Sequence, residues 1–307
     1  MQNWKKLGQI FEVDKNYDWM FSHASVPFAE HIRQDFFKIY FSCRNKNNES
    51  SIGYITINLY NPKEILEISE RPILSKGELG TFDDSGAMGC CILNKDSKKY
   101  LYYIGWNLGV TVPFRNSIGL AISDDGKVFK KAFNGPIIDR TKEEPHFSAS
   151  NCVIEDNGIY KMWYLSCTGW KKEGVKTVHN YHIKYAESAD GVNWIRDGVV
   201  AIDYKDDYEY AISVPRVIKE KGIYKMWFSS RGTEDFSTYR IRYSESEDGI
   251  NWIRKDEEIV IDVSESGWDS EMICYPFIFD HKGERYMLYN GNNYGQSGFG
   301  LAVLQSG

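Results

Sequence analysis

Short runs of alternating hydrophobic and polar residues occur along the chain and predict β-strands. The clearest are residues 181–186 and 239–244, where tyrosine and isoleucine alternate with histidine, lysine and arginine. Successive side chains of a strand point to opposite sides, so this alternation places apolar residues on one face of a sheet and basic residues on the other. No long segment has the 3.6-residue period of an amphipathic helix. We therefore expect an all-β fold.

A sequence motif recurs at a step of about sixty residues, which is the signature of a repeat architecture. The motif Ser-x-Asp-Gly-x-x-aromatic begins at Ser123, Ser188 and Ser246. We expect a structural role for it, in which Ser and Asp cap a turn and the aromatic residue packs between sheets. Asp-Gly and Asn-Gly pairs, which favour hairpin turns, separate the predicted strands.

Four strands in each of five repeats predict a five-bladed β-propeller, in which radial repetition protects the sheet edges. The blades are expected at residues 19–80, 81–143, 144–206, 207–266 and 267–307. The last repeat contains three strands, and the N-terminal stretch around residues 7–13 is expected to supply the fourth and close the ring. Residues 1–307 then form a single domain.

Composition and charge narrow the range of partners. Hydrophobic residues make up 42% and aromatic residues 15% of the chain, which suits packed sheets. The net charge of −6 argues against a nucleic-acid partner, whose phosphates attract basic surfaces. The N-terminus lacks the apolar core of a signal peptide, and no segment approaches the roughly 20 apolar residues of a membrane span. We expect a cytoplasmic protein, and the sequence leaves its oligomeric state open.

The cysteines and histidines do not predict a metal site. The six cysteines show no C-x-x-C spacing, and most lie in apolar runs, so we expect free, buried thiols. The six histidines form no H-E-x-x-H motif. His179 and His182 lie three residues apart in or beside a predicted strand, which puts them on opposite faces. No cofactor is predicted.

Two sets of polar and aromatic segments recur about 21 residues apart within each repeat, and this regular spacing indicates equivalent positions. The first set begins the innermost strands and the second ends the strands that follow. In a propeller both reach the same end of the central channel, so we expect them to line one funnel. The first set is residues 22–27, 82–86, 144–150, 208–215 and 268–272, and the second is residues 42–44, 105–107, 168–170, 229–232 and 290–294.

The residue types in this funnel are those that bind sugars. Carboxylates and amides hydrogen-bond hydroxyl groups in pairs, and indole rings stack on the apolar face of a pyranose. Arginine adds a fork of donors that fits a carboxylate or a phosphate. The predicted substrate-binding residues are His23, Arg44, Trp106, Ser148, Arg231 and Asn292.

The chain resembles the five-bladed propellers of glycoside hydrolase families 43, 32, 68 and 130. It resembles more closely a group of uncharacterised glycosidase-like proteins from bacterial surface-polysaccharide gene clusters. The resemblance covers nearly the whole chain. It is carried by His23 and by residues 80–84, 181–185, 209–211, 229–231, 267–272 and 289–295.

This resemblance implies carboxylate chemistry on a glycoside but does not carry over a complete catalytic set. Families 43 and 32 keep an Asp on the first blade, where this chain has Ser22, His23 and Ser25. Glu144-Pro145 is only loosely similar to the third-blade acid of family 43. The predicted catalytic carboxylates are Asp84, which matches the second-blade carboxylate, together with Glu209, Asp269 and Glu271.

Two functions follow as hypotheses. In the first, an intracellular glycoside hydrolase-like enzyme acts on a sugar, glycoside or activated sugar of surface-glycan metabolism, with Glu209 or Glu271 as the acid and Asp84 or Asp269 as the base. His23 and Arg231 then orient the sugar. In the second, the protein binds a sugar or nucleotide sugar without hydrolysing it. A variant of the second is glycosyl transfer or phosphorolysis, with phosphate held by Arg44 and Arg231.

Overall fold

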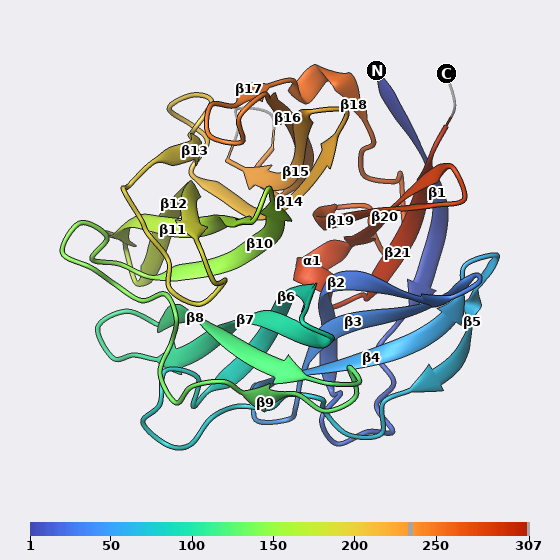
Figure 1. Ribbon diagram of the computed structural model, residues 1–307, viewed down its shortest axis with the longest axis horizontal. Coiled ribbons are helices and arrows are strands. Elements are labelled where there is room, and N and C mark those ends of the chain that lie inside the picture. The colour runs from blue at the N-terminus through green and yellow to red at the C-terminus, as the bar shows by residue number, and fades with distance from the viewer. Residues whose placement is uncertain (233–235, 306–307) are drawn as a thin grey trace.

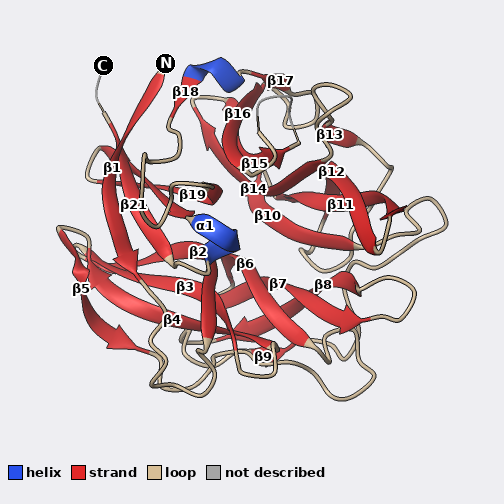
Figure 2. Ribbon diagram, turned by 180° about the vertical axis from the view of Figure 1, so that it is seen from behind, coloured by secondary structure: helices blue, strands red, loops and turns tan. Residues whose placement is uncertain are grey.

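Strands account for nearly all the regular structure of the protein. A computed structural model describes residues 1–232 and 236–305. Within them, the helical segments are α1 (Asn292–Gly295), of four residues, and the 3₁₀ helix η1 (Asp256–Glu258), of three. Figure 2 shows these two short segments among the strands. The all-β prediction is confirmed, and no helix of the described residues is long and apolar enough to cross a membrane.

The first sheet covers the first two predicted repeats. Its strands lie in the order β2-β3-β4-β6-β7-β8-β9, and β5 pairs with β4. The link between the two repeats is a single parallel pair, Ser50 with Gly86. The strands are β2 (Ser22–Arg33), β3 (Phe36–Arg44), β4 (Ser50–Asn58), β5 (Asn61–Ile68), β6 (Gly86–Lys95), β7 (Lys98–Leu108), β8 (Phe114–Ser123) and β9 (Lys130–Lys131).

The second sheet repeats this plan with the next two repeats. Its order is β10-β11-β12-β14-β15-β16-β17, and β13 pairs with β12. Again one parallel pair, Tyr181 with Ala211, links the repeats. The strands are β10 (Ser148–Asp156), β11 (Ile159–Glu173), β12 (Lys176–Ser188), β13 (Val200–Ile202), β14 (Ala211–Glu220), β15 (Ile223–Arg231), β16 (Arg240–Ser246) and β17 (Ile253–Arg254).

The third sheet joins the two ends of the chain. Its order is β18-β1-β21-β20-β19. The N-terminal strand pairs antiparallel with the C-terminal strand, as the sequence predicted, although it spans Gln2–Phe11 rather than residues 7–13. The strands are β1 (Gln2–Phe11), β18 (Ile259–Val260), β19 (Cys274–His281), β20 (Glu284–Asn290) and β21 (Phe299–Leu304).

The first strand of each repeat lies near the centre of the molecule. Figure 1 shows β2, β6, β10, β14 and β19 around the middle, with the later strands of each repeat further out and α1 close to the centre. The starts of these inner strands and the ends of the strands that follow are therefore brought together, as the funnel prediction requires.

The inner strands share a β-bulge at the same level. Register shifts occur in β2, β6, β10, β14 and β19, at the equivalent point of each pairing. At three of these bulges Val26, Val214 and Tyr275 have φ values of 52°, 48° and 57°, and a proline follows each. Bulky side chains rarely adopt this conformation, and such backbone strain concentrates at functional sites.

The repeated Ser-x-Asp-Gly turns link neighbouring repeats. Asp248 Oδ1 accepts hydrogen bonds from the backbone N–H of Ile250 at 2.7 Å and of Asn251 at 2.8 Å. This turn presents the carbonyl of Gly249 to Trp163 Nε1 of the preceding repeat, at 2.8 Å. The carbonyls of Gly191 and Gly126 accept in the same way from Tyr102 and Tyr40. The predicted structural role is confirmed, and its specific task is to join adjacent repeats.

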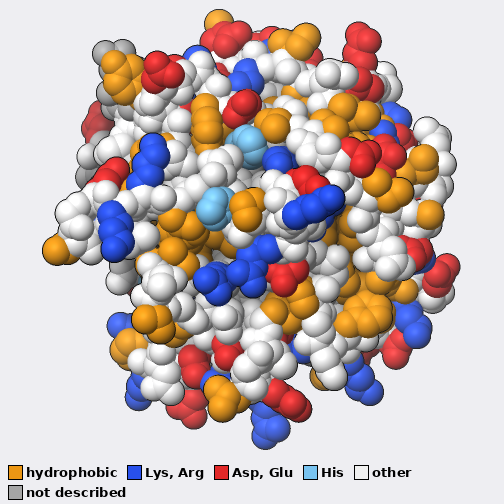
Figure 3. All heavy atoms as spheres, turned by 90° about the vertical axis from the view of Figure 1, so that its left-hand side faces the viewer, with side chains coloured by type: hydrophobic (Ala, Val, Ile, Leu, Met, Phe, Trp, Pro, Cys, Tyr) orange, Lys and Arg blue, Asp and Glu red, His pale blue; other side chains and the backbone are white. Residues whose placement is uncertain are grey.

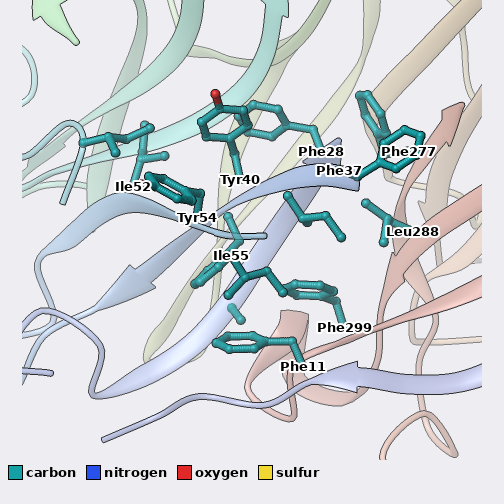
Figure 4. Packing of buried hydrophobic residues seen from close by; sticks show 14 of the residues in the cluster. Phe11, Phe28, Phe37, Tyr40, Ile52, Tyr54, Ile55, Phe277, Leu288 and Phe299 are labelled. Atoms are coloured by element: carbon teal, nitrogen blue, oxygen red, sulfur yellow. The ribbon is translucent and has the colours of Figure 1, made fainter. Parts of the chain in front are cut away.

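Large aromatic and aliphatic side chains fill the space between sheets. Figure 4 shows part of the largest cluster, in which Phe11 and Phe299 from the two chain ends meet residues of β2, β3 and β4. The ring centroids of Phe11 and Phe41 lie 4.8 Å apart. The six cysteines are buried as free thiols within the described residues.

Candidate functional site

Four repeats carry a buried carboxylate just before the inner strand. Three of these groups accept a hydrogen bond from a tyrosine hydroxyl twenty residues later. Tyr103 donates to Asp83 at 2.9 Å, Tyr164 to Glu144 at 2.9 Å, and Tyr289 to Asp269 at 3.1 Å. The fourth carboxylate is Glu209. The regular pairing identifies a structural element shared by these three repeats.

A cation from another strand neutralises each of these carboxylates. Lys131 lies 2.5 Å from Asp83, and Lys6 of the N-terminal strand lies 2.7 Å from Asp269. Arg254 forms two hydrogen bonds to Glu209, at 2.6 and 3.0 Å. The predicted catalytic residues Glu209 and Asp269 are thus ion-paired at 3% and 2% exposure. Their catalytic role stays a prediction, without support from this geometry.

The other two predicted catalytic carboxylates lie apart from these. Asp84 accepts hydrogen bonds from Ser85 Oγ, Asn107 Nδ2 and the backbone N–H of Gly80. Partial burial raises the pKa of Asp84, but these hydrogen bonds outweigh that effect, so the pKa lies below its usual value. A general acid needs a raised pKa. Glu271 is exposed, and its backbone N–H donates to Asn292 Oδ1 at 2.8 Å.

A pocket of 280 Å³ lies where the inner strands begin, and we call it the inner pocket. It contains three of the predicted substrate-binding residues, Arg44, Trp106 and Arg231. None of the described residues that line it is an Asp or Glu. The complete lining is Ser25, Val26, Arg44, Met88, Ile104, Trp106, Phe114, Asn116, Phe147, Ala149, Ser150, Leu165, His179, Tyr181, Ser213, Val214, Arg231, Tyr239, Tyr275 and Tyr294.

One wall of the inner pocket is cationic. The Arg231 guanidinium lies 4.8 Å from the ring centroid of Tyr239 and 5.6 Å from that of Tyr294. Arg231 also donates to the hydroxyls of Tyr294 and Tyr181. Arg44, at the end of β3, donates to Asn48 at 3.3 Å. The two arginines therefore supply positive charge that no lining carboxylate neutralises.

Much of the remaining lining is aromatic and apolar. Trp106 and Phe114 have ring centroids 4.8 Å apart, and Phe114 and Phe147 are 5.5 Å apart. Met88, Ile104 and Leu165 of the same lining extend this surface. Aromatic rings at such distances present a broad apolar face, on which the C–H face of a sugar ring can stack.

Several polar atoms of the lining are buried without a hydrogen-bond partner among the described residues. They are Trp106 Nε1, Asn116 Oδ1, His179 Nδ1 and Arg231 Nε. Buried polar groups in native proteins are nearly always hydrogen-bonded, so a cluster of unpaired ones needs an explanation. Their common position around one cavity leaves these groups available to hydrogen-bond water or a polar ligand.

Two histidines at this site are neutral at physiological pH. Burial, with the nearby Arg44 as the second cause, lowers the pKa of His23 to about 4. Burial and the charge of Arg231 lower the pKa of His179 to about 4. Neutral imidazole offers one donor and one acceptor, so the positive charge of the site comes from the arginines.

The remaining predicted binding residues lie outside the inner pocket. His23 is beside Arg44 and hydrogen-bonds Ser22. Ser148 is 1% exposed in β10. Asn292 is occupied in a turn, where it accepts from the backbone N–H groups of Glu271 and Met272. Among the described residues, no group of three or more His, Cys, Asp or Glu side chains is arranged to hold a metal ion.

The sequence reasoning missed the tyrosines and His179. Tyr181 and Tyr239 begin the two alternating strand sequences and occupy equivalent positions in their repeats, where their hydroxyls are hydrogen-bonded to each other. That shared position in the sequence could have identified both tyrosines as site residues. Tyr275 shares with Val26 and Val214 its place before a proline, which marks the bulges that line the pocket.

Comparison with known proteins places the chain in a family. It matches no protein-family model. It is 44% identical over 303 residues to the uncharacterized protein Rv1502 of Mycobacterium tuberculosis strain H37Rv. The aligned region covers 99% of each chain. The chain belongs to the Rv1502 family. A counterpart in strain CDC 1551, MT1551, is equally similar.

A more distant relative of the Rv1502 family has an assigned activity. A 1,2-beta-oligomannan phosphorylase of Thermoanaerobacter sp. strain X514 is 29% identical over 107 residues, 34% of this chain and 36% of the phosphorylase. The match covers about a third of each protein.

Solved structures give the fold of the Rv1502 family. A glycoside hydrolase matches with a TM-score of 0.76 at 16% identity, covering 98% of this chain and 92% of that one. A thermostable family-43 glycoside hydrolase has a TM-score of 0.64 at 16% identity, covering 96% and 91%. A family-130 structure, from work on mannoside phosphorylases and β-1,2-mannoside hydrolases, has a TM-score of 0.69 at 14% identity, covering 98% and 93%. The predicted resemblance to propeller glycoside hydrolases is confirmed for the fold.

Proposed function

We propose that the protein is a carbohydrate-active member of the propeller glycosidase fold, and that its inner pocket binds a sugar carrying an anionic group. The observation that supports this most is the polarity of the pocket. The lining combines Arg44 and Arg231 with aromatic residues such as Trp106 and Phe114, and no described lining residue is acidic. We further propose that residues 1–307 form one five-bladed propeller domain.

The anionic group is what the arginines recognise. A guanidinium fork binds a carboxylate or phosphate through two parallel hydrogen bonds, and burial strengthens that interaction. The unpaired Arg231 Nε supplies a donor, and Asn116 Oδ1 supplies an acceptor for a sugar hydroxyl. A neutral sugar would leave both arginine charges uncompensated in a half-enclosed site, which costs free energy.

The described lining of the inner pocket does not support hydrolysis by a carboxylate pair there. That mechanism needs two carboxyl groups flanking the glycosidic bond, roughly 5 to 9.5 Å apart. The described lining offers none, and Glu209 and Asp269 are ion-paired elsewhere. Binding without hydrolysis is therefore the first candidate. The hydrolytic roles of Asp84, Glu209, Asp269 and Glu271 remain predictions from the sequence.

Phosphorolysis or glycosyl transfer is the second candidate, favoured by the partial match to an oligomannan phosphorylase. In that version Arg44 and Arg231 hold inorganic phosphate or the phosphate of an activated sugar, such as a nucleotide sugar. We propose for both candidates an intracellular place in surface-glycan metabolism, and the resemblance to proteins of surface-polysaccharide gene clusters supports the surface-glycan part.

The test is a ligand and turnover screen on the purified protein. Sugar phosphates, uronic acids, nucleotide sugars and their neutral parent sugars are assayed by thermal shift, and nitrophenyl glycosides are incubated with and without phosphate. We expect stabilisation by anionic sugars and not by the neutral parents. Turnover that requires phosphate would select phosphorolysis. Hydrolysis in plain buffer that is lost in Glu209→Gln, with the variant still folded, would contradict the proposal.

A further inference from the structure

A second, larger pocket opens beside the inner pocket. Its volume is 920 Å³, and we call it the outer pocket. His179 and Arg231 line both pockets, so the two cavities adjoin at these residues. The outer pocket lies between the β11–β12 hairpin and the loop 203–210. Its remaining lining residues are Lys171, Glu173, Thr177, Val178, Asn180, Asp203, Tyr204, Lys205, Asp206, Asp207, Tyr208, Glu209 and Tyr210.

The two pockets differ in charge. The outer pocket has five acidic side chains against three basic ones, whereas the described lining of the inner pocket has none against two arginines. Arg254 neutralises Glu209, and Asp203 lies 3.1 Å from His182, but Asp206 and Asp207 are exposed to the pocket. A second anionic group is therefore disfavoured in the outer pocket.

The outer pocket carries groups that bind uncharged, multiply hydroxylated molecules. Tyr208 is 59% exposed on the loop, a large aromatic surface open to solvent. Tyr210 faces the shared Arg231 at 5.3 Å, and Asn180 adds an amide. Carboxylates and amides bond hydroxyl groups in pairs, and a tyrosine ring stacks on an apolar sugar face. Figure 3 views the molecule from the side of β11 and β12 and shows acidic, basic, histidine and hydrophobic side chains intermixed there.

The loop that forms this pocket is preformed. Asp206 Oδ1 accepts from the backbone N–H groups of Tyr208 and Glu209, each at 2.9 Å. Glu209 Oε2 accepts from the backbone N–H of Lys205 at 2.8 Å, while Arg254 anchors the same carboxylate. A loop held at several points binds a ligand at a lower entropic cost than a mobile one.

We propose that the outer pocket binds a neutral oligosaccharide chain that continues from the anionic sugar in the inner pocket, with Tyr208 as a stacking platform. This inference rests on the proposed function and extends it from one sugar to a chain. The ligand is then a glycan with a single acidic residue at its buried end and uncharged residues outside.

The test compares affinities along a ligand series by isothermal titration. The probes are uronic acids and sugar phosphates, each free and as the terminal residue of a neutral disaccharide and trisaccharide. In the unmodified protein we expect each anionic probe to gain up to about tenfold in affinity on extension, the size of an aromatic stacking contact. Tyr208→Ala is expected to remove most of this gain.

Tyr60→Ala is the matched control, because Tyr60 is equally exposed, at 61%, and lies outside both pockets. It should leave the gain intact. If free anionic sugars bind but extension adds nothing, the inference is overturned and the proposed function stands. If no anionic sugar binds, the proposed function fails first. A nucleoside diphosphate sugar that binds more tightly than every neutral-chain probe, and loses affinity in Tyr208→Ala, would also overturn the inference.

Discussion

Arg254 forms a bidentate ion pair with Glu209 of the loop 203–210. Nη1 lies 2.6 Å from Oε2, and Nη2 lies 3.0 Å from Oε1. The Glu209 carboxylate is completely buried and Arg254 is 18% exposed. A bidentate pair in this position fixes the loop against β17. This ion pair explains the burial of Glu209, a residue that the sequence predicted to be catalytic.

Removing one partner of this pair should destabilise the fold. Glu209→Gln removes one of the two carboxylates that Arg254 contacts and leaves Asp256, 2.7 Å from Nη2, as the other. Loss of hydrogen bonds to a charged group should cost about 1.5–3 kcal/mol in unfolding free energy. Chemical denaturation measures this directly. Glu271→Gln, at an exposed carboxylate, is the matched control and should change stability by roughly 0.5 kcal/mol or less. Equal stability of the two variants would show that the pair does not carry the structural role.

The Ser-x-Asp-Gly turns provide a second stability test. Asp125 Oδ1 accepts from the backbone N–H of Lys127 at 2.8 Å and from Ser123 Oγ at 3.1 Å, and the turn presents the Gly126 carbonyl to Lys38 and Tyr40. Asp125→Ala should lower the unfolding free energy by about 1–2 kcal/mol, because it leaves the backbone N–H of Lys127 and the Ser123 hydroxyl without their acceptor. Asp124→Ala removes the exposed neighbouring carboxylate and should have almost no effect. A larger loss in Asp124→Ala would contradict the assignment.

Stability should fall with acidification before any carboxylate is protonated. Burial lowers the pKa of His23 and of His179 to about 4, from the usual 6.5 of a histidine. Below pH 6.5 these two histidines are protonated in the unfolded chain but stay neutral in the folded protein. The stability that the neutral histidines give the folded protein is therefore fully present above pH 6.5 and is lost as the pH falls toward 4.

Denaturation midpoints at pH 7.5, 6, 5 and 4 measure this dependence. The double variant His23→Gln/His179→Gln should flatten the profile between pH 6.5 and 4. A profile as steep as that of the unmodified protein would show that these histidines are not the groups responsible.

Repetition explains how much of the fold the sequence revealed. The residue runs beginning at Tyr181 and Tyr239 alternate cleanly, and the Ser-x-Asp-Gly turn recurs in three repeats at equivalent positions, so strand content and order were accessible. The pairing of β1 with β21 followed from counting strands in the last repeat. The start of β1 at Gln2 was not predicted, because its residues lack a clear alternation.

The site was less accessible, for a physical reason. Asp83, Glu144, Glu209 and Asp269 lie where funnel residues were expected, but their partners Lys131, Lys184, Arg254 and Lys6 come from strands distant in sequence. An unpaired carboxylate and an ion-paired one look the same in a sequence. Arg44 and Arg231 were placed in the site by the sequence because they end equivalent strands.

The central claim is that the arginine side of the inner pocket selects an anionic sugar, and paired titrations test it most directly. The affinity of the strongest-binding uronic acid or sugar phosphate is measured against its neutral parent, in the unmodified protein and in Arg44→Gln. Loss of a hydrogen bond to a charged group costs about 1.5–3 kcal/mol. We therefore expect the acid to bind at least about tenfold more tightly than the neutral sugar, and Arg44→Gln to reduce that preference by about 10- to 100-fold. A neutral sugar that binds as tightly as the acid, with no change in Arg44→Gln, would contradict the account.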